Sequence, residues 1–171
     1  GCLGKSYKAL VTDLDNTLWG GVIGDDGVSG IRLGDETPEG RIYQDIQTYI
    51  LNLKKRGIFI TTASKNEIEN AAEGFKKSNS ILAFDDFVKH EINWGPKSHS
   101  IKKISKFLNI GIDSLVFIDD NPTEREEVRK ACPQVFVPEV SEDPSAFLQA
   151  LKFSDPFCID SILTNEDLLR N

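Results

Sequence analysis

The chain has 171 residues, a length that fits one domain, with 20 basic and 27 acidic residues for a formal net charge of -7. This balance argues against broad electrostatic binding to nucleic acid or to an anionic membrane, because both need a basic surface. No apolar run is long enough to span a membrane. We therefore expect one soluble domain over residues 1–171, whose partners are neither nucleic acid nor membrane.

The counts of reactive residues narrow the possible chemistry. Three cysteines, Cys2, Cys132 and Cys158, are an odd number without close spacing. They favour neither a disulfide framework nor a zinc ribbon, which is typical of a reducing compartment such as the cytoplasm. Only two histidines are present, so a histidine-rich metal site is excluded. Carboxylates are the plentiful candidates for catalysis.

Short apolar runs alternate with helical patterns along the chain, which is typical of an α/β domain. We expect a Rossmann-like parallel sheet flanked by helices, with a small glycine-rich hairpin flap and no large cap domain. The predicted elements are, in chain order, a strand over 8–12, the hairpin over 20–34, a helix over 38–55, a strand over 58–62, a helix over 67–77, a short strand over 84–88, a helix over 98–108, a strand over 115–118, a helix over 122–130, a strand over 135–137 and a helix over 144–152.

Two short segments carry further local patterns, one in the glycine-rich segment and one near the end of the sequence. The hairpin prediction uses Gly24-Asp-Asp-Gly27 as the turn between Val22-Ile23 and Val28. At the other end, Thr164-Asn-Glu-Asp167 is typical of a capping box that opens a helix, yet the sequence ends shortly afterwards. Because so short a helix is marginal without tertiary support, we expect the chain to be excised from a longer multidomain protein.

Two pairs of acids follow predicted buried strands. Asp13 and Asp15 follow the strand at 8–12, and in extended chain their side chains project to the same side. Asp119 and Asp120 follow the strand at 115–118, where helix capping explains only part of the acidic run. Ligands bind outside the carboxyl ends of parallel strands, and clustered carboxylates repel unless a cation joins them. The two pairs therefore predict a divalent-metal site, for which Mg²⁺ with oxygen ligands is the usual solution.

Two further segments are candidates for phosphate binding. Ser64-Lys-Asn-Glu67 has the spacing of a capping box, but a hydroxyl and free N–H groups at a helix N-terminus also bind phosphate oxygens. Ser64, Lys65 and Asn66 are therefore candidate substrate-binding residues. Lys97 opens a predicted helix, where a cation opposes the helix dipole. A lysine that reaches the acid cluster and a bound phosphate explains this position better than a solvated surface lysine.

In this order, Asp13-x-Asp15-x-Thr17, Ser64, Lys97 and Asp119-Asp120 resemble the four motifs of the haloacid dehalogenase (HAD) superfamily of phosphohydrolases and phosphotransferases. The similarity covers nearly the whole chain. The wider text looks like the FkbH-like subgroup, HAD subfamily IIIC, in the segments Asp13-Leu-Asp-Asn-Thr-Leu-Trp-Gly-Gly-Val-Ile-Gly, Ser64-Lys-Asn, Asn93-Trp and Phe117-Ile-Asp-Asp-Asn-Pro-Thr-Glu-Arg.

The resemblance implies a role for each motif residue. Asp13 is expected to be the nucleophile and Asp15 the acid/base. Thr17 is expected to support their loop and to be one of the substrate-binding residues. Ser64 is expected to hold phosphate oxygens and Lys97 to neutralise the phosphoaspartate. Mg²⁺ is expected to be held by Asp13, by the backbone carbonyl of Asp15, by Asp119, and by Asp120 directly or through water.

The resemblance also implies a class of substrate. Members with enclosed sites carry a sizeable cap, whereas here the first insertion is only the glycine-rich segment 20–34. The site should therefore be open, which favours a large or carrier-tethered phosphoester over an engulfed small molecule. In this subgroup an acetyltransferase-like domain often follows, and the domain acts near acyl carrier proteins. Both are expected partners.

Several alternatives remain beside a phosphohydrolase. Some FkbH-like enzymes load a glyceryl group onto a carrier protein, with a cysteine expected beside the first aspartates; this chain has Leu14 there, which lowers the loading transferase to second place. The motif order rejects a receiver-like signalling domain, in which the acid pair comes first and the lysine last. A docking module with an inactive site is the least favoured reading.

Overall fold

A four-stranded parallel sheet forms the centre of the computed structural model, which describes residues 7–158. Its strands are β1 (Ala9–Thr12), β2 (Phe59–Ser64), β3 (Lys89–Ile92) and β4 (Leu115–Ile118), in the spatial order β3-β2-β1-β4. The central strand β1 is paired on both sides, so that Val11 lies beside Thr61 and Phe117. The predicted parallel sheet is confirmed. The capping box predicted at residues 164–167 lies outside the described residues.

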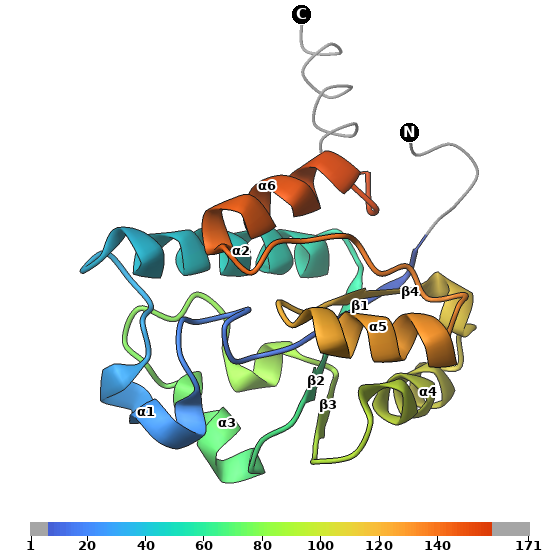
Figure 1. Ribbon diagram of the computed structural model, residues 1–171, viewed down its shortest axis with the longest axis horizontal. Helices are drawn as coiled ribbons and strands as arrows, with labels where there is room; N and C mark the ends of the chain where they lie inside the picture. Colours follow the sequence, from blue (N-terminus) through green and yellow to red (C-terminus); the bar gives the residue numbers. More distant parts are fainter. Residues whose placement is uncertain (1–6, 159–171) are drawn as a thin grey trace, which may run out of the picture.

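Helices cover both faces of this sheet (Figure 1). Because side chains alternate along a strand, Leu10 of β1 packs in a core cluster with residues of α2 and α6, whereas Ala9 and Val11 pack in a second cluster with residues of α4 and α5. The helices are α1 (Ile23–Gly30), α2 (Pro38–Lys55), α3 (Ile68–Gly74), α4 (Lys97–Leu108), α5 (Pro122–Ala131) and α6 (Pro144–Ser154), with short 3-10 turns η1 (Phe84–Asp86) and η2 (Ile112–Ser114).

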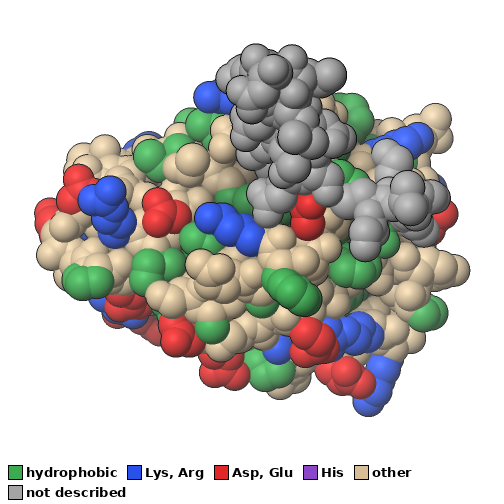
Figure 2. Space-filling view, turned by 90° about the horizontal axis from the view of Figure 1, so that it is seen from above, with side chains coloured by type: hydrophobic (Ala, Val, Ile, Leu, Met, Phe, Trp, Pro, Cys, Tyr) green, Lys and Arg blue, Asp and Glu red, His purple; other side chains and the backbone are tan. Residues whose placement is uncertain are grey.

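The longest helix, α2, has a capped start and a glycine shortly after its end. The Thr37 hydroxyl accepts a hydrogen bond from the Gly40 N–H, and Pro38 occupies the first helical position, where no amide hydrogen is needed. Gly57 follows the helix with φ +90°, a conformation that glycine adopts without strain. The outer surface above α2 and α6 carries interspersed acidic, basic and apolar side chains (Figure 2).

The glycine-rich segment is a helix rather than the predicted two-stranded hairpin. An antiparallel bridge between Gly20 and Arg32 closes its base, as in a hairpin, but the interior forms α1 with a break at Gly27 (φ 67°). The Asp26 carboxylate accepts a hydrogen bond from the Val22 N–H. An acid in a first helical turn also interacts favourably with the helix dipole. The predicted turn residues therefore form a helical turn.

Two predicted strands also differ from the structure. Residues 84–86 form the 3-10 turn η1, and the edge strand β3 begins only at Lys89. The apolar run 135–137 contributes a single parallel bridge, Val116 to Phe136, instead of a fifth strand. Both runs are short, and short apolar runs do not by themselves separate strands from other buried segments. The sheet within residues 7–158 therefore has four strands.

Two further observations complete the fold. Cys132 is buried and has a free thiol. Within residues 7–158, no helix is both long and apolar enough to cross a membrane.

Candidate active site

The predicted site residues meet at the carboxyl ends of the parallel strands. Asp13 directly follows β1, Asp119 directly follows the neighbouring strand β4, and Ser64 ends β2 on the other side. Lys97 enters the same place from the first turn of α4. Together they border a cavity of about 220 Å³, lined by Asp13, Asp15, Asn16, Val22, Ser64, Lys65, Lys97, Asp119, Asp120, Asn121 and Glu124.

Lys97 bridges the two acid-bearing strand ends. Its ammonium lies 3.0 Å from Asp13 Oδ1 and 2.5 Å from Asp119 Oδ2. The Lys97 side chain is 5% exposed and the Asp119 side chain is fully buried. A buried charge is tolerated only when it is paired, so the lysine and the acids depend on one another. The solvated-lysine alternative is thereby excluded.

The cluster nevertheless carries more negative charge than Lys97 neutralises. Burial would lower the pKa of Lys97, but the Asp13 and Asp119 carboxylates outweigh it and hold the pKa above its usual range. Burial, joined by the negative charge of Asp13, raises the pKa of Asp119 to about 8 and that of Asp120 to about 7. Carboxylates that close together resist ionising at once unless another cation compensates them.

Asp15 lies in a different environment from the other three acids. Its Oδ1 accepts hydrogen bonds from the Trp19 indole N–H (3.0 Å) and the Ile23 backbone N–H (2.9 Å), and its Oδ2 accepts one from the Asn66 amide (2.9 Å). Desolvation by burial outweighs these bonds and raises the pKa of Asp15. A raised pKa suits a carboxyl group that must both donate and accept a proton.

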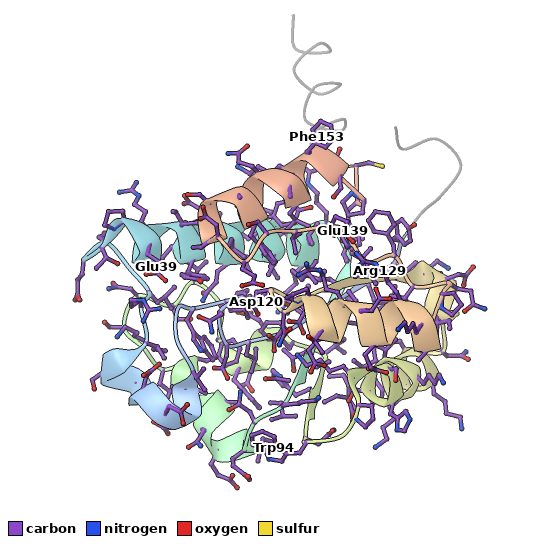
Figure 3. All side chains as sticks on the ribbon, viewed as in Figure 1. Glu39, Trp94, Asp120, Arg129, Glu139 and Phe153 are labelled. Carbon is purple, nitrogen blue, oxygen red and sulfur yellow. The ribbon has the colours of Figure 1, made fainter. Side chains whose placement is uncertain are left out.

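Thr17 and Asn66 lie behind the cavity wall instead of lining it. The Thr17 hydroxyl donates to Asp120 Oδ1 (3.2 Å) and accepts from the Asp120 backbone N–H (3.3 Å), which ties the first acid loop to the second. The Asn66 amide donates to both Asp15 and the Ser64 hydroxyl. Both residues hold the acids in place. Asp120 itself is labelled in Figure 3, beside the start of α5.

The structure adds residues that the sequence reasoning did not single out. The Arg125 guanidinium donates to the backbone carbonyls of both Asp119 and Asp120, at 2.9 and 3.0 Å, and so fixes the turn that carries them. The Glu124 carboxylate lies 2.9 Å from the Lys65 ammonium. Glu124 lies in the first turn of α5, where an acid is favourable to the helix dipole, and a contact between residues far apart in sequence leaves no local signal.

Three of the acids have the chemistry of a metal site. Asp13, Asp119 and Asp120 each offer one carboxylate oxygen, and these oxygens lie within 4.8 Å of one another. An all-oxygen set with uncompensated negative charge fits a hard divalent cation such as Mg²⁺. Burial first, and then the negative charge of Asp13, raise the pKa values of Asp119 and Asp120, as expected for carboxyl groups crowded without a cation.

Comparison with solved structures finds similar chains. The chain is similar to the N-terminal part of the protein BF1531 from Bacteroides fragilis, which contains a phosphatase domain and was crystallised with Mg. The two are 44% identical with a TM-score of 0.86, over 90% of this chain and 41% of that one. This chain therefore spans less than half the length of that relative. No protein-family model and no curated protein matches the chain.

More distant structures share the fold. A HAD family enzyme from Bacteroides thetaiotaomicron, in complex with magnesium and inorganic phosphate, is 14% identical with a TM-score of 0.53, over 80% of this chain and 96% of that one. A haloacid dehalogenase-like family hydrolase from Xanthomonas campestris is 10% identical with a TM-score of 0.58, over 90% and 94%. The chain thus has the Rossmann-like α/β core that these HAD structures share.

Proposed function

We propose that this chain is a Mg²⁺-dependent phosphohydrolase domain of the HAD superfamily, acting on phosphomonoesters or acyl phosphates through a phosphoaspartate. The observation that carries the proposal is the buried cluster in which the oxygens of Asp13, Asp119 and Asp120 lie within 4.8 Å beside the Lys97 ammonium. Phosphoryl transfer depends mainly on positioning and on neutralising charge, and this cluster offers both.

In the proposed reaction, a carboxylate oxygen of Asp13 attacks phosphorus and the bond to the leaving-group oxygen breaks. That oxygen takes a proton from Asp15, whose burial raises its pKa and so favours the protonated form. Water then attacks the phosphorus of the phosphoaspartate while Asp15 takes up its proton. The products are inorganic phosphate and the free Asp13 carboxylate. A carboxylate nucleophile is ionised at neutral pH and needs no activating base.

The charges around Asp13 fit this chemistry. Asp13, Asp119, Asp120 and the Asp15 backbone carbonyl are the proposed Mg²⁺ ligands. When bound, the ion supplies positive charge to the phosphoryl oxygens. Lys97, already 3.0 Å from Asp13 Oδ1, compensates the charge on the phosphorylated side chain.

Some of the remaining site residues are proposed to contact the phosphate group, and others are proposed to hold the aspartates in place. Ser64 and Lys65 line the cavity and are the proposed contacts to phosphate oxygens. Thr17 and Asn66 are predicted from sequence to bind substrate, but their hydrogen bonds to Asp120 and Asp15 favour a supporting role.

A direct test is hydrolysis of p-nitrophenyl phosphate with and without Mg²⁺, by the wild type and by Asp13→Asn. We expect activity only with wild type plus Mg²⁺. Equal rates in the two proteins would overturn the nucleophile, and activity that survives a chelator would overturn the metal site.

The finer assignment is to the FkbH-like subgroup, with an open site that accepts a carrier-tethered phosphoester. It is supported by the small size of α1. Within the described residues, only α1 and α2 lie between β1 and β2, which leaves no large cap domain there. An acyl carrier protein and a fused acetyltransferase-like domain are the partners that this assignment implies. The alternative is a glyceryl- or acyl-loading transferase. Incubation with a phosphorylated acyl donor and a carrier protein separates the two, because only the transferase adds mass to the carrier.

A further inference from the structure

A second ion pair crosses the candidate active site, between loops that are distant in sequence. Lys65 follows β2 and Glu124 lies in the first turn of α5, and their charged atoms are 2.9 Å apart. Both side chains line the cavity that holds the aspartates. Among the ion pairs of residues 7–158, only this one and those of Lys97 have both members in the cavity lining.

Capping of α5 does not account for Glu124. In a capping box the third helical residue accepts a hydrogen bond from the N-cap backbone N–H. Here the N-cap is Asn121, and its N–H donates to Asp119 Oδ1 at 2.9 Å, so that role is already filled. The Asn121 side chain separately accepts from the Thr123 N–H. The Glu124 carboxylate is left for Lys65.

Glu124 also differs from the surface acids of the molecule. Its side chain is 14% exposed, against 39% for Lys65, and its Oε2 is buried without a hydrogen-bond partner among the described residues. A largely buried carboxylate is costly unless a cation compensates it, and Lys65 is the cation within reach. The contact therefore fixes an otherwise flexible lysine at the edge of the cavity.

The cavity needs such a cation. Its lining contains five acids and two lysines, and the ammonium of Lys97 is already engaged by Asp13 and Asp119. A lysine ammonium has three N–H donors, and the bond to Glu124 uses one of them. Lys97 keeps one donor after its contacts with Asp13 and Asp119, whereas Lys65 keeps two, so Lys65 is the lysine in the lining with more donors left for an arriving phosphate.

On the basis of the proposed function, we propose that Lys65 binds the phosphate group of the substrate and that Glu124 is the positioning residue that holds Lys65 there. Glu124 acts through Lys65 and touches neither the substrate nor the reacting atoms. The pair acts on the binding of the phosphate group before transfer, so its removal raises KM and leaves kcat nearly unchanged.

The test compares Lys65→Ala, Glu124→Ala, Glu124→Gln and the double variant Lys65→Ala/Glu124→Ala with wild type, all with saturating Mg²⁺. The readouts are the Kd of inorganic phosphate by calorimetry, and KM and kcat for p-nitrophenyl phosphate. The matched control is Lys76→Ala/Glu73→Ala, which removes an exposed ion pair with 69% and 52% exposed side chains outside the cavity.

We expect Lys65→Ala and Glu124→Ala each to weaken phosphate binding by roughly fivefold to tenfold, with kcat within about twofold of wild type. The double variant should bind phosphate no more weakly than Lys65→Ala alone, because Glu124 acts only through the lysine. Glu124→Gln keeps an acceptor for Lys65 and should retain most of the affinity. The control should match wild type.

Three results would overturn this inference. Additive losses in the double variant would make Glu124 independent of Lys65, tighter phosphate binding in Glu124→Ala would make it a repelling charge, and unchanged Kd in both single variants would leave the pair without a role in binding. If the wild type neither hydrolyses the ester nor binds phosphate, the proposed phosphatase function fails as well. A wild type that does both, with variants that match it, contradicts only the role of the pair.

Discussion

The apolar face of the sheet beneath α2 and α6 differs sharply from the carboxyl ends of its strands. Beneath α2 and α6, side chains such as Leu10, Ile50 and Phe147 are almost fully buried and apolar, and each adds to stability by leaving water. At the carboxyl ends of β1 and β4, the chain buries Asp13, Asp119 and Lys97, whose desolvation is costly. The apolar face holds the strands in place so that their ends can carry charges that work against folding.

The largest effect should come from the charged end. Asp13→Asn removes the proposed nucleophile, and we expect kcat for p-nitrophenyl phosphate to fall by roughly 10⁴-fold or more. The thermal midpoint should not fall, because Lys97 keeps Asp119 as a partner and the cluster loses a repelling charge. Steady-state kinetics and thermal unfolding of the same preparation measure both. A variant that loses activity only because it unfolds would contradict the contrast between the two regions.

The apolar face should give the converse result. Phe147 is 1% exposed in α6, and Phe147→Ala should lower the free energy of unfolding by about 3–5 kcal/mol through lost burial and the resulting cavity. The fraction that remains folded should keep the wild-type kcat. Denaturant unfolding measures the loss, and the exposed Phe153→Ala is the matched control, since Phe153 is 93% exposed. Equal losses in the two variants would show that α6 is not part of the core.

Removal of Mg²⁺ should expose the cost of the buried acids as a pH dependence. Folding raises the pKa of Asp119 to about 8 and of Asp120 to about 7. An acid whose pKa is raised in the folded state stabilises that state while protonated, so stability declines as the pH rises from about 4 towards 8. Saturating Mg²⁺ should oppose the decline, adding about 2.7 kcal/mol at 100 times its Kd.

Thermal midpoints in EDTA and in Mg²⁺, at about pH 5.5 and about pH 8, check this prediction. Asp119→Asn should flatten the EDTA profile, because the amide does not titrate. Stability in EDTA that rises over this range, or a midpoint that ignores Mg²⁺ at the higher pH, would mean that the acids are not short of positive charge.

The smallest effect should come from the start of α2. Thr37→Ala removes the hydroxyl that accepts from the Gly40 N–H and should cost about 1 kcal/mol of stability. Because this helix end serves the apolar layer, kcat and phosphate affinity should stay at wild-type values. Thr37→Ser, which keeps the hydroxyl, should restore most of the stability. A change in activity would show that α2 is coupled to the site.

The sequence was sufficient to predict the acid-bearing strand ends, because there a buried apolar run is followed directly by acidic residues. Val116 and Phe117 form a short, fully buried run, and acids that follow such a run can be assigned to the end of a strand. The sequence could not distinguish two local structures that the same residues favour equally. Gly24-Asp-Asp-Gly27 fits a hairpin turn and a helical turn alike, and only the surrounding contacts decide between them.

Contacts between distant loops were the other gap. That Lys97 would reach the acids could be inferred from its unfavourable place at a helix start, but that it binds Asp13 and Asp119 together depends on the sheet order. Lys65 and Glu124 each had a local explanation, so nothing in the sequence pointed to their pairing. Long-range ion pairs are fixed by packing, which local patterns do not contain.

The central claim is that Asp13 becomes phosphorylated. Asp15→Asn should form the phosphoaspartate from acetyl phosphate and Mg²⁺ but hydrolyse it slowly, because no base is left to activate water. Intact-mass analysis after acid quenching should then show one added phosphoryl group, which peptide mapping places on Asp13. The double variant Asp13→Asn/Asp15→Asn should show none. A phosphoryl group on another residue, or one that persists in the double variant, would contradict the account.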